Sequence, residues 1–106
     1  MRDVSIKIIL KNKNNLLANA NISVNTEAFG YVTLKGFQIW KSIHNNDRLN
    51  DYINITPPKI PARGNFFNII FFESSDKWYL LEKIIYEKFR ATKEEEIDIE
   101  EIPSFN

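Results

Sequence analysis

The sequence predicts an α+β domain: an antiparallel sheet of about five strands, packed by one C-terminal helix and followed by an acidic tail. Apolar residues alternate with period two through much of the first 72 residues, which is typical of strands. Apolar residues at helical spacing appear near the C-terminal end. We expect residues 1–92 to form one domain and residues 93–106 the tail, because 106 residues cannot bury two separate cores.

The first two expected strands flank a polar turn. Apolar positions alternate from Val4 to Leu10, the segment KNKNN at 11–15 is the turn, and LLANANISV at 16–24 alternates again. The following NTEAFG ends at Gly30, which can adopt the positive φ that many turns require.

The next two expected strands are residues 31–40 and 52–55. The first is rich in strand-forming residue types, and Gly36 within it predicts a bulge. The polar residues 42–51 predict a turn region, and Pro57 ends the short strand that follows.

A proline-rich segment and an apolar run come next. TPPKIPARGN at 56–65 predicts a stiff, projecting arm that carries Lys59 and Arg63, because its prolines cannot donate ladder hydrogen bonds. FFNIIFF at 66–72 predicts a buried strand with Phe66 and Phe71 in the core. A strand that is apolar on both faces needs cover on both, and one helix covers one face, so the run also predicts a homodimer.

A capped amphipathic helix completes the expected fold. Ser74 or Ser75 is suited to the N-cap, and Asp76 is favourable in the first turn. Helical spacing from Trp78 to Phe89 gives one apolar face, with Leu81 and Ile85 buried, and the helix can continue into residues 91–96.

The sequence gives little indication of catalysis. Cysteine is absent, and the single histidine, His44, lies in a polar turn where we expect it to be exposed. Glu73 and Asp76 flank the helix start, where a capping role accounts for them, and three scattered glycines form no phosphate loop. We therefore expect no enzyme activity, cofactor or metal. No apolar stretch is long enough to span a bilayer and the N-terminal pattern contains charges, so we expect a cytoplasmic protein.

The charges are divided unequally along the chain. Fourteen basic residues balance fourteen acidic ones, but six of the acids lie in residues 94–106. Residues 1–93 keep eight acids and all fourteen bases, which gives a formal charge of +6 on the body and −6 on the tail. This asymmetry indicates a polyanion partner for the body.

Aromatic residues are abundant, and those not needed in the core could stack on unpaired bases. The residues expected to contact nucleic acid are Lys35, Lys41, Arg48, Lys59, Arg63, Lys77, Trp40 and Tyr52. For any single lysine, a role in solubility alone is an equally good interpretation.

Residues 20–90 resemble the SpoVG (stage V sporulation protein G) family of small bacterial regulators. The resembling segments are ANISV, VTLKGFQIW and YINITPPKIPARGNFFNII, which runs into SSDKWYLLEKIIYEKF. The resemblance implies a sheet-plus-helix protein that dimerises through its strands and binds DNA or RNA with basic loop residues. Lys59 matches the family's loop lysine best. The arginine that usually follows it is replaced by Ile60, and Arg63 would have to supply that charge.

The tail EEEIDIEEIPSFN is similar to the acidic tip of bacterial single-stranded-DNA-binding proteins, which recruits replication and repair proteins. The similarity implies a partner-binding role for Glu100, Glu101, Ile102, Pro103 and Phe105, although Ser104 separates the proline from the phenylalanine and Asn106 follows. Two other interpretations stay open. The segment is a disordered solubilising tail, or it lies on the basic body and competes with nucleic acid.

Together these patterns predict a dimeric, non-enzymatic protein that binds single-stranded DNA or RNA in replication or regulation. The alternative is a protein-interaction adaptor that docks partners through the apolar run and the tail, with lysines that serve solubility.

Overall fold

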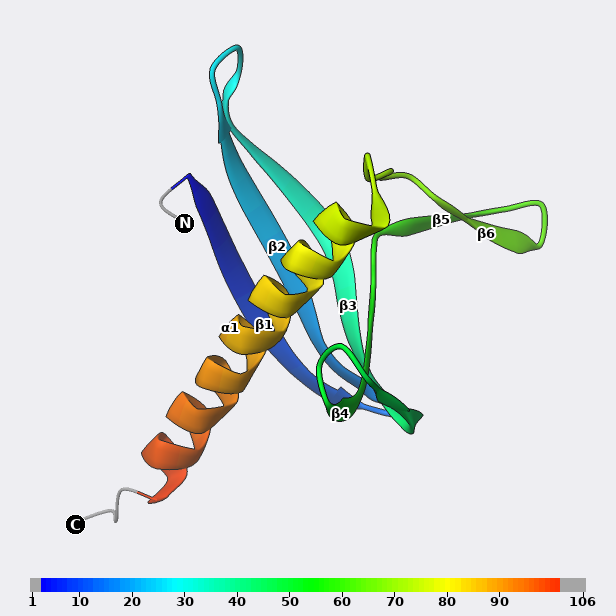
Figure 1. The fold of residues 1–106 in the computed structure, drawn as a ribbon. Helices are drawn as coiled ribbons and strands as arrows, with labels where there is room; N and C mark the ends of the chain where they lie inside the picture. The colour runs from blue at the N-terminus through cyan, green and yellow to red at the C-terminus, as the bar shows by residue number, and fades with distance from the viewer. Residues whose placement is uncertain (1–2, 102–106) are drawn as a thin grey trace.

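The computed structural model describes residues 3–101 and contains one sheet, one separate hairpin and one helix. The sheet is antiparallel, with its strands in chain order (Figure 1). Its strands are β1 (Val4–Lys13), β2 (Leu16–Thr26), β3 (Gly30–Asn46) and β4 (Asp51–Thr56). This arrangement confirms the expected α+β fold.

A bulge in β3 brings the sheet close to the segment that leaves it. The pairing of β2 with β3 changes register between Ala20 and Ile22, opposite the predicted bulge at Gly36. Gly36 has a φ of 103°, and a Cβ at this position would lie 3.3 Å from the Cβ of Pro58. Glycine therefore provides both the backbone conformation and the room for Pro58 to pack against the sheet.

The helix α1 (Ser75–Glu101) crosses one face of the sheet (Figure 1). The Ser74 hydroxyl accepts a hydrogen bond from the Lys77 amide at 3.4 Å, which confirms the predicted start. The helix extends past the expected limit, so the boundary placed at residues 92/93 falls inside it. Within residues 3–101, no helix is long and apolar enough to cross a membrane. The buried core is formed by Ala18, Ala20, Ile22, Phe37, Ile39, Leu49, Ile53, Ile55, Ile85 and Phe89.

The strands turn their alternate residues away from α1. Because side chains alternate between faces, the neighbours of the core positions lie on the opposite side of the sheet. Among the described residues no helix covers this side, which we call the open face. Register places on the open face Lys7, Asn19, Asn21, Gln38, Trp40, Asn54 and Thr56.

The predicted buried strand at residues 66–72 is wrong. Residues 59–68 instead form a hairpin of β5 (Lys59–Ala62) and β6 (Asn65–Asn68), which we call the arm. Phe66 is 70% exposed and Phe71, just beyond the arm, is 83% exposed. The arm projects beside the sheet (Figure 1), as the prolines indicated. Since β6 pairs with β5 and not with the sheet, most of the apolar run has no layer to pack against.

Candidate nucleic-acid interface

A groove of about 560 Å³ lies where the open face meets the arm, and we call it the arm groove. β3 and β4 form one wall, and the arm forms the other. Its lining residues are Gly36, Gln38, Trp40, Thr56, Lys59 and Phe66.

The local sequence explains why these side chains meet. Gln38 and Trp40 are two residues apart in β3 and therefore point to the same face, where Gln38 is paired with Thr56 of β4. The chain then passes through two prolines, of which Pro58 packs against Gly36, and enters the arm at Lys59. Phe66 follows after the arm's tight turn. The groove thus has one aromatic side chain from the sheet, one from the arm, and a cation beside them.

This combination suits an unpaired nucleotide. An aromatic ring offers a stacking surface to a base, and a lysine ammonium attracts phosphate. The amide of Gln38 and the hydroxyl of Thr56 supply donors and acceptors for base edges. The groove itself contains no carboxylate that would repel a phosphate.

The rest of the open face is mainly polar, with Ile9 opposite Asn19 and Leu16 opposite Trp40 as apolar positions. The Ser23 and Thr33 hydroxyls are hydrogen-bonded across β2 and β3 at 2.8 Å. Asn19, opposite Gln38, has a buried Oδ1 without a hydrogen-bond partner among the described residues. Lys7 pairs with Asn21 across β1 and β2. The face that continues from the arm groove therefore carries amides, hydroxyls and a cation.

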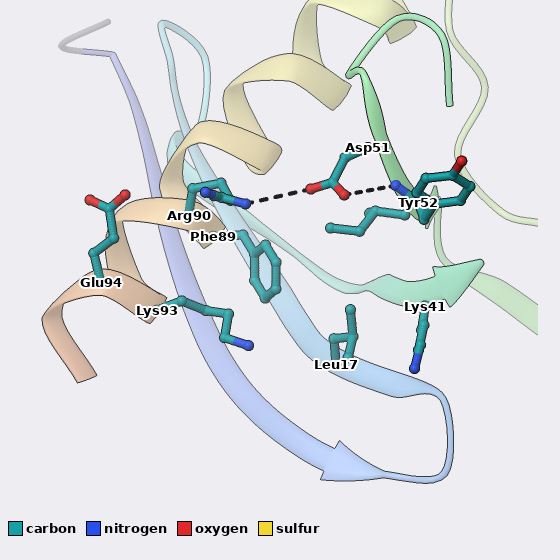
Figure 2. A pocket seen from close by; sticks show the side chains of 9 residues that line it. Leu17, Lys41, Asp51, Tyr52, Phe89, Arg90, Lys93 and Glu94 are labelled. Carbon is teal, nitrogen blue, oxygen red and sulfur yellow. Dashed lines mark hydrogen bonds and ion pairs between the residues drawn. The ribbon is translucent and has the colours of Figure 1, made fainter. Parts of the chain in front are cut away.

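A second groove, of about 440 Å³, lies at the junction of α1 with the sheet (Figure 2). We call it the junction groove. It contains Lys41, which the sequence placed in the nucleic-acid interface, on the helix side of the sheet and not with Trp40. Tyr52 is 58% exposed, and its side chain points away from the helix (Figure 2). The residues that line this groove are Leu17, Lys41, Asp51, Tyr52, Ile53, Phe89, Arg90, Lys93 and Glu94.

Asp51 anchors the start of β4 to α1 beside this groove. Its carboxylate accepts a hydrogen bond from the Tyr86 hydroxyl at 2.8 Å and lies 3.5 Å from the guanidinium of Arg90. It also accepts a hydrogen bond from the Tyr52 amide at 2.7 Å. Burial raises the pKa of Tyr86 above its ordinary value, and the hydrogen bond to Asp51 acts in the same direction.

Arg48 forms an ion pair with Glu82, a partner that the sequence did not indicate. Glu82, on α1, is 1% exposed. Its carboxylate accepts hydrogen bonds from Arg48 Nε at 2.8 Å and from Arg48 Nη2 at 3.1 Å. Asn46 donates a further hydrogen bond to this carboxylate at 3.3 Å, and the Arg48 guanidinium lies 4.3 Å from the centre of the Tyr79 ring. The hydrogen bond to Glu82 raises the pKa of Arg48. These contacts fix the β3–β4 turn to the helix and direct the Arg48 charge inward.

The other expected contacts are dispersed. Lys35 is exposed beside the Gly36 bulge, and Arg63 is exposed at the tip of the arm, so both lie on segments that border the arm groove. Lys77 lies in the first turn of α1, outside both grooves. His44 is exposed, as expected. In the described part of the chain, no group of three or more histidines and carboxylates could hold a metal ion.

The tail was expected to separate from the domain, but its first part belongs to α1. Glu100 and Glu101 lie in the last turn of the helix, and Ile102, Pro103 and Phe105 lie outside the described residues. The partner-binding role implied for these five residues stays a prediction.

Phe66 was expected in the core but lines the arm groove. Gln38 and Thr56, which also line it, were not among the residues expected to contact nucleic acid. The period-two spacing of Gln38 and Trp40 in β3 is a signal that could have identified part of one wall, and the pairing of Gln38 with Thr56 adds the β4 residue. Nothing in the sequence indicates that Phe66 would face it.

Comparisons of the chain with protein-family models, with curated proteins and with solved structures found no match in any of the three. The resemblance to the SpoVG family therefore stays a prediction, and the function is inferred from the geometry of the grooves.

Proposed function

We propose that this chain is a non-enzymatic protein that binds single-stranded DNA or RNA in the arm groove, and that it acts in replication or regulation. The observation that carries the proposal is the meeting of Trp40, Phe66 and Lys59 in one groove. These three side chains come from β3, β6 and β5, and together they offer stacking surfaces and a phosphate contact.

The groove favours single strands because of what stacking requires. In a duplex both faces of each base are covered by neighbouring bases, so Trp40 and Phe66 could stack only on bases that are unpaired. The open face beyond the groove gives neighbouring nucleotides hydrogen-bonding groups, including the amides of Asn21 and Asn54.

The distribution of charge supports the same proposal. Among the described side chains, ion pairs engage Arg48 and Arg90. Lys7, Lys35 and Lys59 are exposed on the open face, at the bulge and on the arm, and no described carboxylate is paired with them. Their charges are therefore accessible to phosphate.

Replacing Trp40 or Phe66 by alanine should weaken binding of a fluorescent oligothymidylate about tenfold each, because one base–aromatic contact is lost. Lys59→Ala should weaken binding less and lower the slope of log K against log salt by about 0.7, the value for one phosphate contact on a single strand. Fluorescence anisotropy at several stated salt concentrations measures both quantities.

Phe71→Ala and Lys83→Ala are matched controls, since both side chains are exposed and lie outside the arm groove. They should bind the oligonucleotide as the parent chain does. If Trp40→Ala and Phe66→Ala also bind as tightly as the parent while circular dichroism shows intact folds, the arm groove is not the contact surface.

The acidic C-terminal segment gives a further prediction for nucleic-acid binding. Removing residues 94–106 should tighten binding at low salt, because six acids that compete with phosphate for the basic body are removed. The difference should disappear as salt rises. Anisotropy titrations of both chains test this, and equal affinities at low salt would rule out the competitor role.

The arm supports the expected alternative, a protein-interaction adaptor, and also the expected homodimer. It exposes apolar side chains at Ile60, Phe66 and Phe67, and Ile69 and Phe71 directly follow it. Exposed apolar groups gathered on one projection are typical of protein-binding surfaces. Retention on a single-stranded DNA column that decreases with salt supports the nucleic-acid proposal, whereas an adaptor would flow through.

A further inference from the structure

The junction groove combines an apolar floor with a cationic rim. Phe89 and Ile53 are buried, and Leu17 beside them is half-buried. Lys41 projects from β3 and Lys93 from α1, on opposite sides of this floor (Figure 2). The Lys93 ammonium lies 5.9 Å from the centre of the Phe89 ring, so charge and apolar surface are adjacent.

The accessible charge of this groove is positive. Asp51 is occupied by Arg90 and by the Tyr86 hydroxyl. Glu94 is the other acid on the rim, and no described carboxylate is paired with Lys41 or Lys93. An apolar floor with two available ammonium groups suits a peptide in which apolar side chains are flanked by carboxylates.

The chain contains a segment of this chemistry. Residues 94–106, EEEIDIEEIPSFN, combine six acids with three isoleucines, a proline and a phenylalanine. Because α1 continues unbroken to Glu101, its last turns extend past the edge of the sheet (Figure 1). Glu94, the first residue of the segment, lines the groove of its own chain, but the last turns of the helix lead away from that groove, which favours a second copy as the source of the segment.

We propose that the junction groove binds residues 94–106 of a second copy of this chain. Apolar side chains of the segment occupy the floor formed by Leu17, Ile53 and Phe89, and its carboxylates contact Lys41 and Lys93. The contact is head-to-tail and does not use the arm groove. Its ionic part weakens as salt rises.

The first test uses a fluorescent peptide of residues 94–106 titrated with the full chain, followed by anisotropy. The double variant Lys41→Glu with Lys93→Glu should bind the peptide about tenfold more weakly, because both ammonium contacts become repulsive. Lys83→Glu makes the same change at an exposed site on α1 outside the groove, and it should bind as the parent does.

The second test asks whether the contact joins two molecules. One variant carries the double lysine change, so its groove is impaired and its segment intact. The other keeps Glu94, which lines the groove, and has the five acids of residues 95–106 replaced by glutamine, so its segment is impaired and its groove intact. Sedimentation velocity should show that mixing the two restores a salt-sensitive association that each alone has lost. This complementation is independent of any association through the arm, which both variants retain.

Equal peptide binding by the parent and the double variant would overturn the proposal. A peptide with its isoleucines and phenylalanine replaced by serine should bind more weakly, and unchanged binding would show that the apolar floor has no role. If the mixture does not associate although the peptide binds, a second copy does not occupy the junction groove, and the proposal is overturned. The occupant would then be the chain's own segment or another acidic protein. A labelled oligonucleotide that displaces the peptide without binding the arm groove would identify nucleic acid as the occupant.

Discussion

Arg48→Ala is expected to lower the free energy of unfolding by about 2–3 kcal/mol. Removing one partner of a buried ion pair costs about 3–5 kcal/mol, because the other charge is left buried and unpaired. Glu82 meets that condition at 1% side-chain exposure, but Arg48 is 46% exposed, so water can enter and reduce the cost. Urea unfolding followed by circular dichroism measures the change.

Arg63→Ala is the matched control for this substitution. It removes the same side chain from the exposed tip of the arm, where no ion pair with a described residue engages it, and should change stability by less than about 0.5 kcal/mol. Combining Arg48→Ala with Glu82→Gln should restore part of the loss, because the buried charge is also removed. Equal stability of the Arg48→Ala and Arg63→Ala chains would show that the Glu82 contact does not hold the β3–β4 turn.

Local sequence signals predicted the fold well where each element is determined by its own pattern. Alternation and strand-forming residue types identified the four strands of the sheet. Gly36 indicated the bulge, and the capping serines indicated the start of α1 near Ser75. The burial of Glu82 could not be predicted in this way. A glutamate at that position in a helix is ordinarily exposed, and the arginine that neutralises it lies 34 residues earlier in a turn.

The candidate site was partly predictable for the same reason. Trp40 and Lys59 were expected to contact nucleic acid, and both line the arm groove. Lys41 differs from Trp40 by one position in β3, and that single step moves it to the opposite face. Arg48 was expected to contact nucleic acid, but its guanidinium is paired with Glu82, 34 residues later in α1. The face on which Lys41 lies and the partner of Arg48 depend on contacts between segments that are distant in the sequence. The type of a residue does not predict such contacts.

The apolar run at residues 66–72 shows the limit of composition as a guide to burial. Seven mostly apolar residues between turn signals favour a core strand when read alone. The preceding prolines and Gly64 instead allow residues 65–68 to pair with residues 59–62, and this hairpin has no second layer. Half-buried Phe72 contacts Trp78 at 5.2 Å between ring centres, so the core begins to cover the run only at its end.

The same phenylalanine-to-alanine change should therefore have opposite consequences at two positions. Phe37 is fully buried, and its ring lies 6.4 Å from that of Trp78, so Phe37→Ala should lower the free energy of unfolding by about 3–5 kcal/mol. Phe71 is 83% exposed, and Phe71→Ala should change it by less than about 0.5 kcal/mol. Urea midpoints of the two variants, compared with that of the parent chain, test the difference.

The two variants also distinguish a packed core from a covered surface. The cost of Phe37→Ala should not depend on protein concentration, because its cavity lies within one chain. If Phe71→Ala is nearly neutral in dilute solution but costly at high concentration, the exposed run is buried between copies, as the expected homodimer requires. A large cost for Phe71→Ala that is the same at all concentrations would mean that residues 66–72 belong to the core after all. That result would also remove the arm wall of the proposed nucleic-acid groove.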